Sequence, residues 1–379
     1  MSYKWNQQID IPWWSSKDYI QFPSGKKQRS DHKKNNIKII ISLFVVVLIL
    51  IFVYLGKISI KSVSQTDSKI DIKIWTPVYD VWTWWISQIQ PVTGTLLYSP
   101  KHSWDKRQET IKRSSDYLYV WMYNITHIDA VNVIRWLARD GTQVKLILED
   151  NKYLQWEDNG NSINLSWRGI QVKNDSDLWT NYVHAKWFIS NSFAIIQTAN
   201  LTYGWFESSR EYYFISEDSQ IISGLKYIFD HDRAWAKIDP DTIHPNILVC
   251  PIDCRSKIQT LLYEANESIL MQNQYVQDEQ LETILNLKKD QWVEIKITLP
   301  KNDDNLSYQN DFGTGVRVVS SPYIHAKMIL VDDRYLLISS INISSNSMDN
   351  NRELWIITTD REAIEKFKKV FYIDWNKWK

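Results

Sequence analysis

Two His-x-Lys motifs in this chain carry side chains that could act on a phosphate group. Each motif is followed at matched spacing by an asparagine and an arginine-glutamate pair: His184, Lys186, Asn200, Arg210 and Glu211 in the first copy, and His325, Lys327, Asn342, Arg352 and Glu353 in the second. Residues i and i+2 of a strand share a face, so each motif places an imidazole beside an ammonium. The duplication predicts two half-sites that meet in one active site.

These residue types could break a phosphodiester bond. A neutral imidazole can attack phosphorus if a second group protonates the leaving oxygen and cations hold the non-bridging oxygens. One histidine would form a covalent phosphohistidine, and the other would act first as acid and then as base. Each histidine also needs a carboxylate that fixes its tautomer, and Glu211 and Glu353 are the expected partners.

These motifs resemble the signature of the phospholipase D superfamily, His-x-Lys-x4-Asp-x6-Gly-Ser-x-Asn followed by a distal glutamate. The second copy matches this signature at five positions, with Ser339 in place of the glycine: His325, Lys327, Asp332, Ser340 and Asn342. The first copy keeps the histidine, lysine, asparagine and glutamate, with Asn191 in place of the aspartate. It is one residue shorter, has Thr198-Ala199 near the Gly-Ser position, and is expected to have lost the serine hydroxyl.

The resemblance covers roughly residues 71–379. It implies a two-step phosphodiesterase that needs no metal and no cofactor, with its site between two α/β halves. By this resemblance His184 is the nucleophile and His325 the general acid, assisted by Lys186, Lys327, Glu211 and Glu353. Asn200, Asn342 and Ser340 are expected to bind the substrate phosphate, and Asp332 and Asn191 to hold the local structure. Arg210 and Arg352 are interpreted as surface or ion-pair arginines.

The expected fold is an α/β fold of two duplicated halves related by pseudo-twofold symmetry. Strands are predicted at 118–120 and 144–148 around a helix at 129–139, and the order recurs with strands at 269–271 and 295–299 around a helix at 278–287. We expect half 1 at 71–235 and half 2 at 236–379. Both half-sites lie in one chain, which favours a monomer.

The amino-terminal region predicts a membrane anchor. Residues 1–36 form a polar tail with a basic cluster, 37–56 an apolar run long enough for one transmembrane helix, and 57–70 a linker. The basic cluster precedes the span, so the tail is expected in the cytoplasm and the catalytic part outside it. A cleaved signal peptide is the alternative, although no typical cleavage site follows the run.

Tryptophan is unusually frequent, with 20 residues against 10 glycines. Several tryptophans stand where a turn favours glycine, and Trp292 aligns with Gly141 of the internal repeat, just past a helix. We hypothesise that the source organism reads one codon as glycine that is translated here as tryptophan. The alternative is a chain that is simply rich in aromatic residues.

The sequence leaves several functions open. Lys+Arg and Asp+Glu both number 44, so no overall basic excess favours nucleic acid as the partner. The membrane anchor favours phospholipid hydrolysis of the phospholipase D type. A cardiolipin synthase-like phosphatidyltransferase, a nuclease and a weakly catalytic membrane scaffold are the alternatives. Cys250 and Cys254 could form a disulfide in an oxidising compartment or remain two small core residues.

Overall fold

A computed structural model describes residues 59–66, 69–75, 83–100, 104–149, 169–174, 180–202 and 208–377. The chain divides into two compact units, Met1–Val81 and Trp82–Lys379. In the first unit the described residues form an antiparallel pair, β1 (Ser59–Thr66) and β2 (Lys69–Trp75), so strands occupy most of the range expected to be a linker. The predicted tail and transmembrane helix, 1–56, lie outside the described residues. Within the described ranges, every helix is too short or too polar to cross a membrane.

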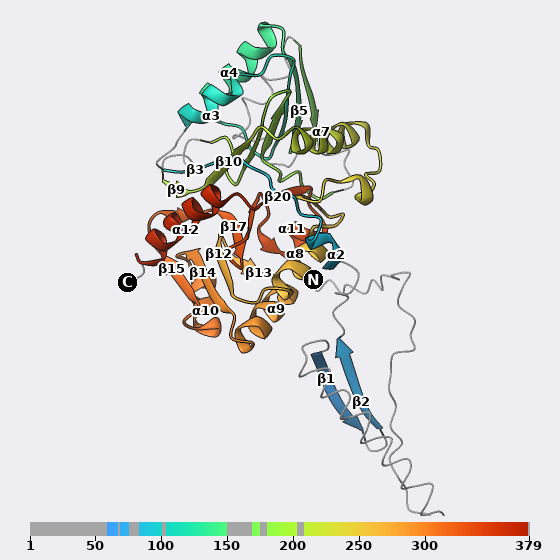
Figure 1. The fold of residues 1–379 in the computed structure, drawn as a ribbon, viewed down its shortest axis with the longest axis vertical. Coiled ribbons are helices and arrows are strands. Elements are labelled where there is room, and N and C mark those ends of the chain that lie inside the picture. The colour runs from blue at the N-terminus through green and yellow to red at the C-terminus, as the bar shows by residue number, and fades with distance from the viewer. Residues whose placement is uncertain are drawn as a thin grey trace, which may run out of the picture. The chain divides into compact units, whose positions relative to one another are not determined.

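Two seven-stranded sheets with the same strand order build the second unit (Figure 1). The first runs β3 (Thr95–Tyr98), β10 (Tyr212–Ser216), β8 (Ala194–Gln197), β7 (Trp187–Ser190), β4 (Tyr117–Met122), β5 (Gln143–Leu148) and β6 (Ile170–Asn174). The second runs β11 (Ile247–Cys250), β20 (Glu353–Thr358), β18 (Tyr335–Ser339), β17 (Lys327–Val331), β12 (Ser268–Asn273), β14 (Glu294–Pro300) and β15 (Val316–Val319). In each sheet the last three strands are parallel and the others pair antiparallel. This repetition confirms the duplicated α/β fold.

The helices follow the same duplication. The first half contains α2 (Thr83–Ile86), α3 (Trp104–Ile111), α4 (Ile128–Arg139) and α7 (Ser219–Ala234), and the short helix η3 (Pro240–Thr242) leads to the second half. The second half contains α8 (Cys254–Tyr263), α9 (Glu279–Asp290), α10 (Asp303–Phe312), α11 (Ser345–Asp349) and α12 (Arg361–Trp375). The long helices α7 and α12 correspond, and each begins at an aspartate whose side chain caps two main-chain N–H groups.

Amphipathic patterning accounts for the elements that the sequence predicted. Helix α4 buries Ala130, Val133, Ile134 and Leu137, which recur at helical spacing and face the first sheet. Strands β4, β5, β12 and β14 and helix α9 also lie where the sequence predicted them. Helix α9 begins after Asp278, whose carboxylate caps the Leu281 N–H.

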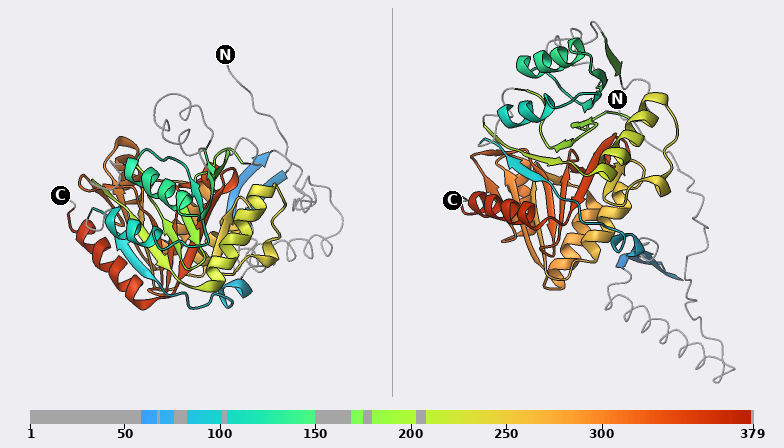
Figure 2. Two further views of the ribbon diagram at one scale, coloured as in Figure 1. Left: turned by 90° about the horizontal axis from the view of Figure 1, so that it is seen from above. Right: turned by 45° about the horizontal axis from the view of Figure 1, so that its top comes forward.

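The largest hydrophobic core lies between the two sheets. It joins strand residues of both halves, such as Tyr119, Trp187, Leu270 and Met328, with the apolar faces of α7 and α12. A separate core packs α3 and α4 on the other face of the first sheet. Figures 1 and 2 show α12, in red, beside the boundary between the two halves. The sheets are therefore held together over a shared core, which fixes the two half-sites against each other.

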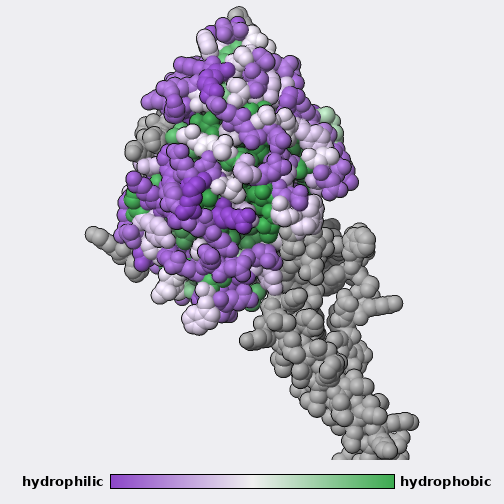
Figure 3. Space-filling view, viewed as in Figure 1, coloured by the Kyte–Doolittle hydropathy of each residue, from purple (hydrophilic) through white to green (hydrophobic). Residues whose placement is uncertain are grey.

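The side of the body that Figure 3 shows is largely polar. Figure 3 shows hydrophilic residues over most of this face, with hydrophobic residues gathered in smaller patches. This distribution fits an α/β body whose apolar side chains are mostly buried in the hydrophobic cores.

Two tryptophans adopt a backbone conformation that favours glycine. Trp235, directly after α7, has φ of 55°, and Trp292, two residues after the end of α9, has φ of 66°. Gly141, the repeat partner of Trp292, has φ of 98°. A left-handed conformation is uncommon for a bulky side chain and routine for glycine, so these positions favour the hypothesis of a reassigned glycine codon.

Candidate active site

Short strand segments of the two halves pair with each other beside the histidines. Strand β9 (Ser209–Arg210), just before Glu211, pairs in parallel with β16 (Tyr323–Ile324), just before His325. In the symmetric position Val183 bridges to Arg352. The main-chain N–H of His325 donates to Arg210 O at 3.2 Å, and that of His184 donates to Arg352 O at 3.0 Å. Each histidine therefore lies beside the glutamate of the opposite half.

This pairing produces two crossed histidine-glutamate pairs. His184 Nδ1 lies 2.8 Å from Glu353 Oε1, and His325 Nδ1 lies 2.5 Å from Glu211 Oε1. Both glutamates are fully buried, and the two histidine side chains are 14% and 6% exposed, in that order. The Nδ1 atoms are thus committed to carboxyl groups, which leaves Nε2 as the reactive nitrogen of each ring. The sequence identified both glutamates but did not show that each serves the histidine of the other copy.

The two lysines lie buried in the same centre. Lys186 Nζ donates to His184 O at 2.5 Å, and Lys327 Nζ donates to His325 O at 2.6 Å. Burial lowers the pKa of Lys186 to about 7 and that of Lys327 to about 8, because the charged ammonium loses hydration. Each lysine also experiences the charges of both Glu211 and Glu353. These couplings join both half-sites into one electrostatic cluster.

Burial also controls the charge of the histidines. It lowers the pKa of His184 and holds that of His325 well below its usual value, and neighbouring lysines act in the same direction. Burial raises the pKa of Glu211 to about 8. His184 also contacts Tyr123 edge to face, with ring centroids 4.9 Å apart, and the Lys186 ammonium lies 5.3 Å from that ring. The sequence gave no reason to single out Tyr123, whose counterpart by strand register is Gln274.

The first motif retains the hydroxyl that the sequence suggested it had lost. Thr198 Oγ1 accepts from Tyr212 N at 3.0 Å, as Ser340 Oγ accepts from Leu354 N at 3.4 Å. Thr198 also donates to Glu211 Oε2. The expectation of a missing hydroxyl was therefore wrong: the first loop is one residue shorter, and Thr198 takes the position of Ser340.

The predicted phosphate-binding asparagines have unused hydrogen-bonding capacity. Among the described residues, the buried side-chain oxygens of Asn200 and Asn342 have no hydrogen-bond partner. Buried polar atoms are usually paired, so these two oxygens show that neither asparagine side chain is fully engaged within the described residues. Phosphate oxygens accept hydrogen bonds, so an asparagine would bind them through its Nδ2–H groups. The Ser340 hydroxyl accepts from the Leu354 N–H, and this bond leaves its O–H able to donate to a phosphate oxygen.

Asp332 and Asn191 occupy the same position in the two motif copies, and both lie in turns rather than among the reactive groups. Asp332 follows β17, and its carboxylate accepts from the main-chain N–H groups of Asn266, Glu267 and Ser268 at 2.8–3.1 Å. Asn191 follows β7 and donates to Ser115 Oγ at 3.0 Å. The turn of the second motif is thus held by several charge-assisted hydrogen bonds to Asp332, whereas the turn of the first motif is held by a hydrogen bond from the neutral amide of Asn191.

The arginines before the glutamates form crossed, buried ion pairs. Arg210 donates to both oxygens of Asp374 at 2.6 and 3.0 Å, and Arg352 lies 3.0 Å from Asp232. Both arginines are buried, so the surface interpretation was wrong and the ion-pair interpretation is confirmed. Sequence reasoning missed both aspartates, although each lies near the end of α7 or α12 and follows the arginine of its own copy, not that of its ion pair, at the same spacing.

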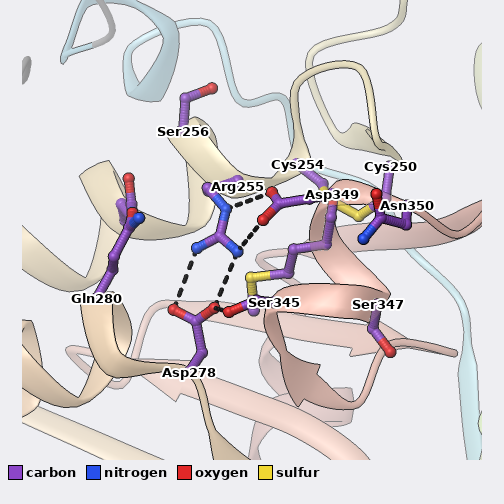
Figure 4. Close-up of polar contacts among 12 residues, drawn as sticks. Cys250, Cys254, Arg255, Ser256, Asp278, Gln280, Ser345, Ser347, Asp349 and Asn350 are labelled. Atoms are coloured by element: carbon purple, nitrogen blue, oxygen red, sulfur yellow. Dashed lines mark hydrogen bonds and ion pairs between the residues drawn. A yellow bond between two sulfur atoms is a disulfide. The ribbon is translucent and has the colours of Figure 1, made fainter. Parts of the chain in front are cut away.

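A disulfide and an ion-pair network hold the segment between Asn342 and Glu353. Cys250 and Cys254 are joined, and Cys250 O accepts from Arg352 Nη1 at 2.8 Å. Figure 4 shows Arg255 between Asp278 and Asp349, with contacts of 2.5–3.1 Å to both carboxylates. These contacts connect α8, the start of α9 and α11. The disulfide and the Arg255 ion pairs therefore lie beside the segment that leads to Glu353.

Across the described ranges, no group of three or more His, Cys, Asp or Glu side chains is arranged to hold a metal ion. The arrangement offers two histidines oriented by carboxyl groups, two buried ammonium groups and two asparagine side chains whose Nδ2–H groups can donate. Such a set can bind a phosphate, attack it and move a proton.

Comparisons with known proteins identify the family. The model described as "Cardiolipin synthase, PLD-like domain" matches residues 108–233 and 258–375. The chain is 29% identical over 128 residues to a cardiolipin synthase of Oceanobacillus iheyensis, covering 31% of this chain and 27% of that protein. It is 24% identical over 183 residues to cardiolipin synthase A of Pseudomonas entomophila, covering 41% and 38%. The chain thus spans well under half the length of these curated relatives.

The fold also recurs in a solved structure. Polyphosphate kinase from Porphyromonas gingivalis superposes with a TM-score of 0.61 at 15% identity, over 74% of this chain and 50% of that one. This likeness concerns the fold alone. The family match covers more than half of the chain and includes both His-x-Lys motifs. The chain is therefore a member of the phospholipase D superfamily, within the family of cardiolipin synthase PLD-like domains.

Proposed function

We propose that this chain transfers a phosphatidyl group from a phospholipid to an alcohol through a phosphohistidine intermediate. The crossed histidine-glutamate pairs carry the proposal. They leave both Nε2 atoms free to act at one phosphate-binding centre, where we assign an unprotonated Nε2 to His184 and a protonated Nε2 to His325. The family match and two cardiolipin synthase relatives support an alcohol as the acceptor.

In the first step His184 acts as the nucleophile. Its Nδ1–H donates to Glu353, so the lone pair of Nε2 is free to attack phosphorus. The N–P bond forms as the bond from phosphorus to the leaving oxygen breaks. Lys186, Lys327, Asn200 and Asn342 surround the phosphate oxygens, where the lysines offset the charge that develops on them. The negative charge of the phosphodiester favours the protonated form of both lysines.

His325 supplies the proton to the leaving oxygen. Because the pKa of Glu211 is raised to about 8 and that of His325 is lowered, the pair at neutral pH carries one proton between Glu211 and Nδ1 and a second on Nε2. Nε2 gives its proton to the leaving group as Nδ1 takes the proton from Glu211. This relay never requires a fully charged imidazolium in the buried site.

The second step reverses the roles. The incoming alcohol gives its proton to His325 Nε2, and its oxygen attacks phosphorus as the N–P bond to His184 breaks. The Nδ1 proton returns to Glu211, and both pairs regain their starting states. Water in place of the alcohol would give hydrolysis, the activity that the sequence favoured first. The relatives favour transfer over hydrolysis.

The acceptor can be identified by product analysis. The full chain would be incubated in mixed micelles with phosphatidylglycerol labelled in its phosphate. We expect labelled cardiolipin and free glycerol, with phosphatidic acid a minor product. Phosphatidic acid as the main product at saturating acceptor would support hydrolysis and remove the transfer proposal. If the chain instead cleaves labelled single-stranded DNA and leaves the phospholipid intact, a nuclease is supported.

We also propose that the chain is anchored in the membrane with its catalytic part outside the cytoplasm. The apolar run at 37–56 and the preceding basic cluster motivate this topology, and the Cys250–Cys254 disulfide is typical of oxidising compartments. Protease added to intact cells should remove the catalytic part and spare the amino-terminal tail. Protection of the catalytic part in intact cells, with digestion after lysis, would contradict the topology.

A further inference from the structure

In the mechanism above, the alcohol that leaves the phosphate lies on the His325 side of the site. The attacking and leaving atoms of a displacement at phosphorus lie roughly in line, so the leaving alcohol is opposite His184 Nε2. His325 gives its proton to this alcohol in the first step and takes a proton from the acceptor alcohol in the second. Polar side chains beside His325 are therefore in a position to recognise both alcohols.

Tyr323 lies on the same face of the chain as His325. Ile324 and Ala326 are fully buried in the core between the sheets. Strand β16 and the bond from the His325 N–H to Arg210 O keep this segment extended. Side chains alternate between faces in an extended chain, so Tyr323 and His325 point away from that core. Tyr323 is partly exposed, so this face reaches solvent next to the buried histidine.

Gln274 is hydrogen-bonded to Tyr323. Its Nε2–H donates to the Tyr323 hydroxyl at 3.1 Å. Its main-chain oxygen accepts from Nδ2 of the buried Asn305 at 3.0 Å. Gln274 directly follows β12 and is partly exposed. A glutamine amide has two N–H groups and an acceptor oxygen, so beyond the bond to Tyr323 this side chain can both donate to and accept from a hydroxyl.

Tyr275, the next residue, connects this pair to the phosphate-binding residues. Burial raises the pKa of its hydroxyl, and interactions with Glu353 and Tyr323 add to the increase, whereas a hydrogen bond to Asn342 lowers the pKa. Tyr275 is therefore near Tyr323 and also near two residues of the reactive centre. This proximity supports a position of the glutamine-tyrosine pair at the edge of the active site.

The first half has no such pair at the matching positions. By strand register the counterpart of Gln274 is Tyr123, which contacts His184 edge to face. The counterpart of Tyr323 is Tyr182, which also lies two residues before its histidine and is 40% exposed. Both positions of the first half thus carry aromatic rings, whereas the second half carries an amide held by a phenol.

We propose that Gln274, oriented by Tyr323, determines the specificity for the alcohol by binding a hydroxyl of a glycerol-type headgroup. This inference rests on the proposed function, because it uses the assignment of His325 as the general acid. One hydroxyl of the alcohol is bonded to phosphorus, and Gln274 binds another. The carboxyl groups of Glu211 and Glu353 are already paired with the histidines, so an uncharged polyol fits this side better than a cationic headgroup.

The test compares two headgroups that differ only in hydroxyl groups. Phosphatidylglycerol and phosphatidylpropanol give the same phosphatidyl-histidine, and their three-carbon alcohols differ by two hydroxyls. The full chain would act on an equimolar mixture of the two lipids in mixed micelles, and the released glycerol and 1-propanol would be measured together. The ratio of the two products reports the ratio of the kcat/KM values, so it does not depend on the fraction of folded protein.

Two variants remove the proposed contact and one serves as a matched control. We expect the wild-type chain to release glycerol in preference to 1-propanol. Gln274→Leu, which removes the amide at similar size, should lower this preference by about 10-fold, in the range of one lost hydrogen bond. Tyr323→Phe removes the hydroxyl that holds the amide and should lower the preference by about 3-fold. Tyr182→Phe makes the same change beside His184 and should keep the wild-type ratio.

An unchanged ratio in Gln274→Leu would overturn the proposal and, should that variant not fold, so would an unchanged ratio in Tyr323→Phe. A wild-type chain without preference for glycerol, or an equal loss in Tyr182→Phe, would also overturn it.

The same measurement separates this inference from the proposed function, because the headgroup leaves before the phosphatidyl group is passed on. Phosphatidic acid as the main product, with the expected change of ratio in Gln274→Leu, would remove the transfer proposal and leave the role of Gln274 standing. Cardiolipin formation with an unchanged ratio would have the opposite meaning. Release of neither alcohol by the wild-type chain would remove both.

Discussion

The His325–Glu211 contact, at 2.5 Å, is shorter than the His184–Glu353 contact, at 2.8 Å, and in the proposed mechanism the proton that His325 and Glu211 share makes the two half-sites different. The pKa of Glu211 is raised to about 8, so the proton is present below this pH and lost above it. Lys327, with a pKa of about 8, loses its charge over the same range. Turnover should therefore decline as pH rises through about 8.

Glu211→Gln tests this relay. Glutamine can hold the ring but cannot pass a proton to Nδ1, so we expect turnover to fall by about 10²- to 10⁴-fold, the usual contribution of general acid-base catalysis. Steady-state rates across pH would measure both the loss and the alkaline limb. Wild-type turnover in Glu211→Gln, with its alkaline limb unmoved, would show that Glu211 does not hold the reactive proton.

At the same scale, the tryptophan hypothesis makes a chemical prediction. Mass spectrometry of the protein from its natural source should find glycine at Trp82, Trp84 and Trp292; indole masses there would refute reassignment. Trp187 and Trp355 add to the motivation, because their buried indole nitrogens have no hydrogen-bond partner in the described part of the chain.

A recombinant comparison tests the same residue thermodynamically. Trp292 is 95% exposed at φ of 66°, so Trp292→Gly should raise the free energy of unfolding by about 1 kcal/mol by relieving the left-handed backbone. Trp136→Gly, at an exposed position inside α4, should lower it by about 1 kcal/mol. Denaturant titration of both variants would compare them, and destabilisation by Trp292→Gly would contradict the argument.

At the scale of elements, crossed ion pairs hold the arginines that directly precede the two glutamates. Arg210→Met would remove the buried cation of Asp374 and leave it only the half-exposed Lys377 at 3.4 Å, and breaking a buried pair costs about 3–5 kcal/mol. Arg113→Met breaks an exposed pair with Glu217 and should cost about 0–1 kcal/mol. Thermal unfolding would separate the two. Equal, small losses would show that the pair between the halves contributes little to stability.

Local patterns predicted the regular elements well. Helix α4 and strand β5 follow from helical and strand periodicity, and the same order identified α9 and β14. The pairing of β9 with β16 could not be predicted in this way, because two-residue strands leave no periodic signal. The sequence therefore identified the histidines, lysines, asparagines and glutamates of the site, whereas the crossed pairing and the roles of Asp232, Asp374 and Tyr123 needed the tertiary structure. Thr198 was misassigned because a one-residue deletion hides its equivalence to Ser340.

At the scale of the whole molecule, one shared core holds both sheets, and each half completes the reactive site of the other. Neither His-x-Lys motif has its orienting carboxyl group without the opposite half. We therefore propose that the duplicated chain is one catalytic unit in which His184 receives the phosphatidyl group and His325 moves the proton.

Mapping the covalent intermediate tests this claim most directly. The full chain would be quenched during turnover of phospholipid labelled in its phosphate, and the labelled peptide located by mass spectrometry at high pH, where phosphohistidine survives. We predict label on His184, no label in His184→Ala, and slow accumulation in His325→Ala with a good leaving group. Label on His325 in the wild-type chain, or turnover without any labelled histidine, would contradict the account.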